Sequence, residues 1–332
     1  MSVVATATRS ERTIRDVPTV RCVGGPTRTK LLTLTASEGS VHRLVRLGKA
    51  ALPPAIMDRV RYLASPLRYA EDRPRDLARV ESAAYGWDTD AVAEREGAKW
   101  AAFTGRLSDS GLLGFSHEAP VLDERDNLYH HNVVMDFAFA LGRALAHSGA
   151  ARTSILDWGG GLGHYAAIAR ALYPRAPFDY AIKETPAMAT LGRRLNPEVR
   201  WFDDDACFAH QYDLVVVNAS LQYMQDWRAL VPRLAASSRA FAVFLRIPVV
   251  RRAATFRAIQ RAYDREMVHL QFNEAELMAC AASAGLDLDR ELLVGGHPFV
   301  RGAPEQPTMR GWLFRTWPPA DVPRLRQDSL AP

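Results

Sequence analysis

Cysteine is scarce in this chain of 332 residues, and Cys22, Cys207 and Cys280 lie far apart. Three isolated cysteines argue against a disulfide framework and against a zinc site built from paired cysteines, so we expect no metal. No apolar run approaches the roughly 20 residues that span a bilayer, and the first 30 residues lack the apolar core of a signal peptide. We therefore expect a cytoplasmic protein with no membrane partner.

A concentration of charge of one sign is also missing. The chain has 42 Lys and Arg residues against 37 Asp and Glu residues, a net charge of +5, and its arginines are scattered. Because proteins that bind nucleic acids normally gather basic residues in a stripe, we expect no nucleic-acid partner. Nothing in the sequence indicates an oligomeric state.

The pattern of apolar residues changes near residue 150, from helical spacing to alternating strand and helix signals. Residues 1–35 are rich in Thr and Arg and are expected to form a disordered tail. Residues 36–150 carry apolar side chains at helical spacing and are expected to form a helical cap, in which Thr89 caps one helix. A loop is expected from Leu107 to Asn132, followed by a last helix that ends before Gly149.

Residues 151–332 alternate between strand and helix signals, which predicts a parallel sheet with helices on both faces. In such sheets ligands bind beyond the carboxyl ends of the strands. The stretch 251–272 contains five arginines and is expected to form a basic amphipathic helix, either solvated or bordering the access of an acidic acceptor molecule. The candidate strands are 153–157, 178–183, 199–202, 212–218, 240–247, 290–294 and 311–317.

A glycine-rich turn joins the first expected strand to the next helix. Asp157, Gly159, Gly161 and Gly163 form the pattern D-x-G-x-G-x-G, in which glycines let the backbone approach a ligand closely. A dinucleotide-binding turn would need a glycine where His164 stands, and a phosphate-binding P-loop would need Gly-Lys followed by Ser or Thr. The turn therefore favours S-adenosylmethionine (SAM), which has no phosphate.

Acidic and amide residues follow the next three expected strands. Glu184 lies 21 residues after Gly163, close to the ~20-residue spacing at which an acid binds a ribose diol. One of Asp203 and Asp204 is expected to accept a hydrogen bond from the adenine amino group, unless the acids there form a solvated turn. Asn218 begins a segment that would face the methionine part of SAM or the methyl acceptor.

Several segments resemble the motifs of class I SAM-dependent methyltransferases. They are Leu156–Tyr165, Glu184–Arg193 and the segment from Asn218 to Trp227. The chain is most similar to a bacterial subgroup found in natural-product and surface-polymer gene clusters, which it also resembles in Tyr85-Gly86-Trp87 and in Glu124-Arg125-Asp126.

This resemblance implies an α/β fold, a Rossmann-like seven-stranded class I methyltransferase sheet with an N-terminal helical cap and a reversed last strand at Gly311–Trp317. The catalytic domain would then span 151–332. The implied function is SAM-dependent methylation of a small molecule in secondary metabolism. Some proteins similar to this subgroup instead cyclise SAM, whose amine displaces methylthioadenosine to give azetidine-2-carboxylate. A non-catalytic partner protein with a SAM fold is the third possibility.

The sequence singles out no catalytic base. Methyl transfer depends largely on positioning, and a base helps where the acceptor must lose a proton. His131 is the candidate base, and Asn132 is a candidate contact to the amino acid part of SAM. Tyr165 and Tyr223 either pack in the core or line the pocket, where Tyr165 would make a cation–π contact to the sulfonium.

Overall fold

The computed structural model describes residues 3–5, 20–22, 54–82, 86–107, 113, 128–149 and 152–316. The chain divides into two compact units, Met1–Ser65 and Pro66–Pro332. In the first unit, β1 (Val3–Ala5) pairs antiparallel with β2 (Val20–Cys22). Helix α2 (Pro54–Leu63) begins with a proline, a residue whose fixed φ suits a first helical turn. Most of the tail expected at 1–35 lies outside the described residues.

The second unit opens with one short strand and four helices. The predicted cap of α4 is confirmed, because the Thr89 hydroxyl accepts a hydrogen bond from the Val92 N–H at 3.3 Å. Our loop prediction was too long, since α6 begins at Leu128 and carries His131 and Asn132 within its first turns. The boundary at residue 150 stays a prediction. The strand that opens the second unit is β3 (Leu67–Tyr69). The four helices after it are α3 (Pro74–Ser82), α4 (Asp90–Gly97), α5 (Trp100–Leu107) and α6 (Leu128–Ser148).

Among the described residues, seven strands form the central part of an 11-stranded sheet, in the order β6-β5-β4-β7-β8-β13-β11. The first five strands of this order, β6, β5, β4, β7 and β8, are parallel to one another. Strand β13 runs antiparallel to both of its neighbours, β8 and β11. The predicted Rossmann-like sheet with a reversed last strand is therefore confirmed. The strands are β4 (Thr153–Trp158), β5 (Phe178–Lys183), β6 (Arg200–Phe202), β7 (Tyr212–Asn218), β8 (Ser238–Val250), β11 (Leu286–Leu292) and β13 (Thr308–Thr316).

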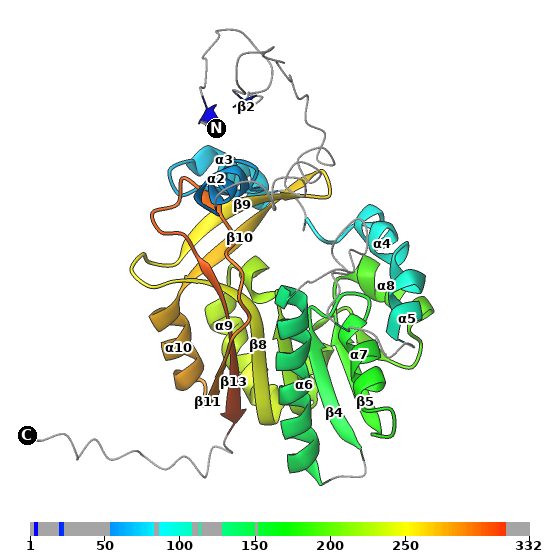
Figure 1. Ribbon diagram of the computed structural model, residues 1–332. Helices are drawn as coiled ribbons and strands as arrows, with labels where there is room; N and C mark the ends of the chain where they lie inside the picture. The colour runs from blue at the N-terminus through cyan, green and yellow to red at the C-terminus, as the bar shows by residue number, and fades with distance from the viewer. Residues whose placement is uncertain are drawn as a thin grey trace, which may run out of the picture. The chain divides into compact units, whose positions relative to one another are not determined.

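Helices cover both faces of this sheet (Figure 1). Strand residues alternate between the two faces: Leu214 and Val216 of β7 pack in the core with α6, α7 and α8, and Val215 and Val217 pack in the core with α9 and α10. None of the helices in the described ranges is long and apolar enough to cross a membrane. The remaining helical elements are α7 (His164–Leu172), α8 (Pro186–Leu195), η1 (Asp205–Ala209), η2 (Leu221–Tyr223), α9 (Trp227–Ser237) and α10 (Glu274–Ser283).

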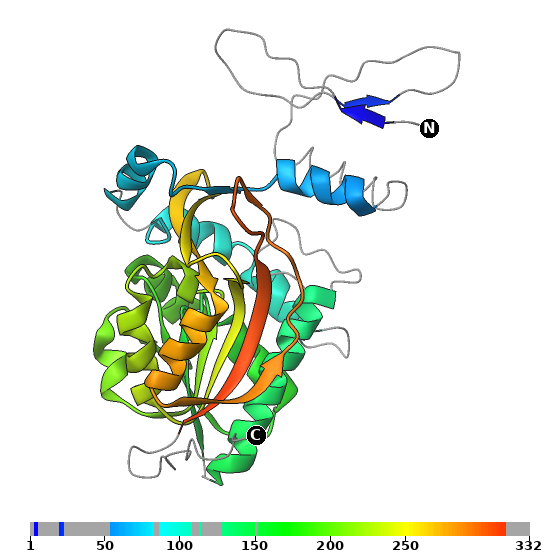
Figure 2. The same cartoon turned by 90° about the vertical axis from the view of Figure 1, so that its left-hand side faces the viewer.

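The helix predicted over 251–272 was wrong, because this stretch forms a β-hairpin. Strands β9 (Phe256–Ala262) and β10 (Arg265–Asn273) pair antiparallel, and β10 joins the central sheet through Phe272 opposite Val249 of β8. Tyr263 and Asp264 link the two strands with φ of 52° and 59°, the backbone of a tight hairpin turn. Figures 1 and 2 show the hairpin beyond the central strands. Strand β3 extends it, followed by β12 (Val300–Arg301).

Candidate functional site

The glycine turn follows the carboxyl end of β4. Gly159, Gly161 and Gly163 have φ of 75°, 59° and 88°, which residues with side chains rarely adopt. A Cβ on Gly159 would lie 2.4 Å from the Cβ of Ser220, and one on Gly163 would lie 2.4 Å from Nδ2 of Asn196. A Cβ on Gly161 would meet only His164 Nδ1 at 3.7 Å. The turn thus packs tightly at Gly159 and Gly163, whereas a Cβ on Gly161 would make only an ordinary van der Waals contact.

Asp157 supports this turn from beneath. Its side chain is fully buried and accepts a hydrogen bond from the Tyr180 hydroxyl at 3.1 Å. A Cβ on Gly160 would lie 2.6 Å from the Asp157 carboxyl carbon, so the carboxyl group packs directly against the turn. Burial raises the pKa of Asp157 to about 7, while the bond from Tyr180 opposes that rise. Asp157 therefore shapes the turn, and contact with a cofactor stays a prediction.

Glu184, at the end of β5, is bonded to the turn itself. Its Oε1 accepts from the Gly161 N–H at 3.0 Å, and its Oε2 accepts from the Thr185 N–H at 2.7 Å. Burial raises the pKa of Glu184, although these two N–H groups and Lys183 act in the opposite direction. An ionised carboxylate has about four acceptor positions, so two remain for a ligand such as a ribose diol.

The two aspartates after β6 make local contacts. Asp203 Oδ2 lies 3.2 Å from Nη2 of Arg193, in an exposed ion pair. Asp204 caps η1, since its Oδ1 accepts from the Ala206 N–H at 2.9 Å. Neither contact reaches the glycine turn. Their predicted role at the adenine amino group stays a prediction.

Asn218 ends β7 beside an arginine that the sequence did not single out as a site residue. Its Oδ1 accepts from Nε of Arg246 at 2.7 Å, and its buried Nδ2 has no hydrogen-bond partner within the part of the chain that is described. Arg246 is only 5% exposed, and both it and Ala219 have positive φ, 54° and 55°. Strained residues of this kind concentrate at functional sites. The available signal was an arginine inside the otherwise apolar run of β8.

The four candidate catalytic residues lie in different surroundings. Tyr165 is 6% exposed and meets Phe137 edge-on, with ring centroids 5.0 Å apart. Tyr223 donates a hydrogen bond from its hydroxyl at 2.9 Å to the side-chain oxygen of Gln260 in the hairpin. His131 and Asn132 lie in α6, where Nδ1 of His131 is buried without a partner among the described residues. Catalytic roles for all four stay predictions.

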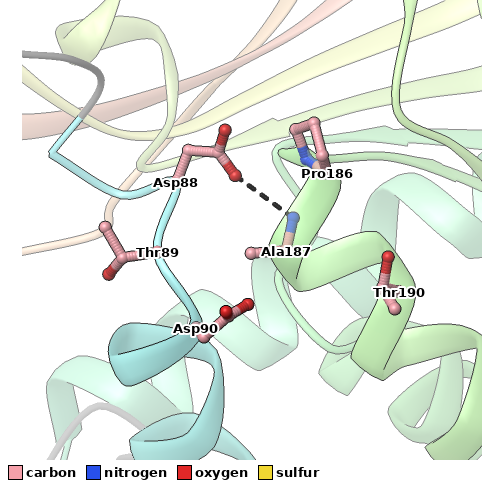
Figure 3. A pocket seen from close by; sticks show the side chains of 6 residues that line it. All are labelled: Asp88, Thr89, Asp90, Pro186, Ala187 and Thr190. Carbon is pink, nitrogen blue, oxygen red and sulfur yellow. Dashed lines mark hydrogen bonds between the residues drawn. The ribbon is translucent and has the colours of Figure 1, made fainter.

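A cavity of about 380 Å³ lies between the starts of α4 and α8 (Figure 3). The Asp88 carboxylate accepts from the Ala187 N–H at 3.1 Å across this cavity. This bond fixes the N-terminal end of α8, which directly follows Glu184. The cavity is lined by Asp88, Thr89, Asp90, Pro186, Ala187 and Thr190.

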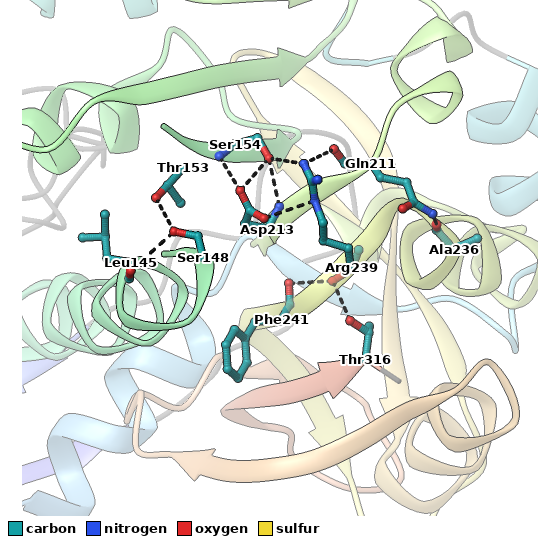
Figure 4. A network of polar contacts seen from close by, with 11 residues as sticks. Leu145, Ser148, Thr153, Ser154, Gln211, Asp213, Ala236, Arg239, Phe241 and Thr316 are labelled. Carbon is teal, nitrogen blue, oxygen red and sulfur yellow. Dashed lines mark hydrogen bonds and ion pairs between the residues drawn. The ribbon is translucent and has the colours of Figure 1, made fainter. Parts of the chain in front are cut away.

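A polar network ties the opposite, amino-terminal ends of the strands (Figure 4). Asp213 Oδ2 accepts from both the N–H and the hydroxyl of Ser154 at 2.8 Å, and its Oδ1 lies 3.1 Å from Nε of Arg239. These residues belong to β7, β4 and β8. The network is therefore structural, and it lies far along the strands from the glycine turn.

No family model and no curated protein matches the chain. Similar solved structures include magnesium protoporphyrin IX methyltransferase from Synechocystis PCC 6803 with bound SAM, at 14% identity over 69% of this chain and 98% of that one, TM-score 0.38. The N-terminal domain of EvdMO1 with S-adenosylhomocysteine (SAH) is 16% identical over 66% and 97%, TM-score 0.42. Burkholderia thailandensis 1,6-didemethyltoxoflavin-N1-methyltransferase is 16% identical over 60% and 93%, TM-score 0.34. At such values these similarities carry no argument about function.

Proposed function

We propose that the chain binds SAM on the turn Asp157–Gly163 and transfers its methyl group to a small molecule of secondary metabolism. The observation that carries this proposal is the bond from the Gly161 N–H to Oε1 of Glu184. It joins the carboxyl ends of β4 and β5, where parallel sheets bind their ligands. The reversed β13 and the absence of a glycine at position 164 favour SAM over a dinucleotide.

The groups on this edge of the sheet fit the parts of SAM. A Cβ on Gly161 would have no contact closer than 3.7 Å, so a ligand can approach the backbone here. Glu184 keeps two acceptor positions for the ribose diol. The unpartnered Nδ2 of Asn218 is a donor suited to the carboxylate of the methionine part. Asp203 and Asp204 follow the neighbouring strand and are proposed to meet the adenine.

Bound SAM supplies a methyl group on a positively charged sulfur. The protein's contribution is to align that methyl group with the acceptor and to exclude water. Tyr223 is suited to be a fixed wall, since its ring and hydroxyl are both held by the hairpin. We propose His131 for accepting a proton from the acceptor, with Asn132 and Tyr165 around the methionine part.

Two product assays test this function. Calorimetry should show SAM binding. Incubation of the protein with SAM should form SAH when a suitable acceptor is added and should form none without it. Incubation with SAM alone separates the alternatives: methylthioadenosine together with azetidine-2-carboxylate would assign the chain to SAM cyclisation. Failure to bind SAM would make it a non-catalytic protein with this fold.

A further inference from the structure

The hairpin β9–β10 has two chemically different faces. Neighbouring residues of a strand point to opposite faces, so Ile259 of β9 and Val268 of β10 pack with α3 on one of them. The other face, which we call the site face, carries Gln260, Met267, His269 and Gln271. The site face turns toward Tyr223, the last residue of η2, which lies in the segment after β7.

Two charged side chains of the hairpin, Arg257 and Glu266, are paired on the face opposite the site face. Arg257 of β9 forms ion pairs with Glu71 and Glu81, at 2.8 and 2.9 Å. Glu266 of β10 pairs in the same way with Arg68, at 3.3 Å, and with Arg79. Arg257 therefore does not border the access of an acidic acceptor, and for the other arginines of 251–272 that alternative stays a prediction.

The buried side chains of the site face are uncharged, while Arg265 lies on the same face at the turn end of β10 and is exposed. His269 is 3% exposed, and burial lowers its pKa to about 4, so its ring is neutral at physiological pH. Its Nδ1 lies 2.7 Å from Nε2 of Gln271. Trp87 and His269 each meet the Tyr223 ring edge-on, with centroids 5.3 and 5.2 Å apart. The surface thus combines aromatic rings with neutral hydrogen-bonding groups.

Two buried amides on this surface have unused hydrogen-bonding capacity. Gln271 is 0% exposed and Gln222 of η2 is 2% exposed, yet the side-chain oxygen of each has no partner among the residues that the structure describes. Nε1 of Trp87 is also buried and has no hydrogen-bond partner among the described residues. Buried polar atoms are nearly always paired, and an unpaired one costs about 1–3 kcal/mol. A ligand with complementary donors and acceptors would satisfy these atoms.

We propose that the site face, together with Trp87, Gln222 and Tyr223, binds the methyl acceptor, and that this acceptor is an uncharged planar molecule with hydrogen-bonding groups. A lactam or a neutral phenol has this chemistry. The inference rests on the proposed methyl transfer and adds the class of acceptor to it. A charged acceptor would lose its hydration here without gaining an opposite charge from the buried side chains of the site face.

Calorimetry with a matched pair of planar probes tests this proposal. With SAH present, quinolin-2-one should bind at least tenfold more tightly than quinoline-2-carboxylate, which has the ring system and a negative charge. Gln271→Leu and Gln222→Leu should each weaken quinolin-2-one binding about tenfold, the effect of one buried hydrogen bond. Both variants should keep the SAH affinity of the unaltered protein, and the Tm of Gln271→Leu should fall because His269 Nδ1 loses its contact with Gln271 Nε2. Gln211→Leu, at the opposite end of β7, is the matched control and should change neither affinity.

Three results would overturn the acceptor surface: no binding of quinolin-2-one, equal or tighter binding of the carboxylate, or full quinolin-2-one affinity in both glutamine variants. Measuring SAH binding in the same protein separates this failure from failure of the proposed function. A protein that binds SAH without preferring the neutral probe contradicts only the surface. A protein that binds no SAH contradicts the methyltransferase itself.

Discussion

At the scale of single residues, Asp157 links the glycine turn to the pH dependence of stability. Its pKa in the folded protein is about 7, against an ordinary value of 3.8. Between these values the folded state binds more protons than the unfolded state, so the free energy of unfolding falls as pH rises. Each pH unit of pKa displacement corresponds to about 1.4 kcal/mol, so the loss amounts to a few kcal/mol.

Asp157→Asn should remove the part of the fall in unfolding free energy with rising pH that comes from Asp157. The amide oxygen still accepts from Tyr180, and no charge forms beneath the turn. Denaturant unfolding at pH 4 and at pH 7.5 should show a smaller fall in stability for the variant than for the unaltered protein. Identical falls in the two proteins would mean that Asp157 is not the group that titrates.

Glu184 is the residue whose charge the proposed site needs most. Glu184→Gln keeps the size of the side chain but replaces one acceptor oxygen with a donor, which then faces the Thr185 N–H. Hydrogen bonds to charged groups contribute about 1.5–3 kcal/mol, so SAM affinity should fall roughly 10- to 100-fold. The exposed Glu198 provides the matched control, because Glu198→Gln should bind SAM normally. Normal SAM affinity in Glu184→Gln would remove Glu184 from the ribose site.

At the scale of elements, β4, β7 and β8 are joined at their amino ends by Asp213. Asp213→Ala leaves the guanidinium of Arg239 and the Ser154 N–H without their acceptor. Leaving the buried Ser154 N–H without its acceptor costs about 1–3 kcal/mol, so the Tm should fall. SAM affinity at the carboxyl ends should be unchanged at temperatures well below the Tm. A loss of affinity without a loss of stability would contradict the structural role.

Elements with a clear hydrophobic period could be predicted from the sequence, and the hairpin could not. Strands β5 and β7 have the predicted bounds, because apolar runs marked their extent. In β9 and β10 the arginines suggested a helix face, and the linking residues Tyr263 and Asp264 lack the Asn-Gly type of turn signal. The site face stayed hidden for the same reason.

At the scale of the whole molecule, local motifs predicted the central sheet better than they predicted the hairpin β9–β10 and the contacts between distant segments. The glycine turn and Glu184 lie close in sequence to the strands that position them, so spacing alone predicted their meeting. Contacts such as Tyr223 to Gln260 or Asp88 to Ala187 join segments far apart in the chain. Pairings of this kind depend on the finished fold and leave no periodic signal in the sequence.

The central claim is that SAM occupies the space above Gly161. Gly161 and Gly285 both have positive φ, 59° and 82°, and a Cβ on Gly285 would meet nothing within 4 Å. A valine at either position should therefore cost a similar free energy of unfolding, about 1–2 kcal/mol. Only at position 161 would the side chain enter the proposed ligand space.

Calorimetric titration of SAM into the unaltered protein, Gly161→Val and Gly285→Val is the most direct test. The account predicts at least a hundredfold loss of affinity in Gly161→Val and unchanged affinity in Gly285→Val. Equal SAM affinity in all three proteins would contradict the placement of the cofactor on this turn.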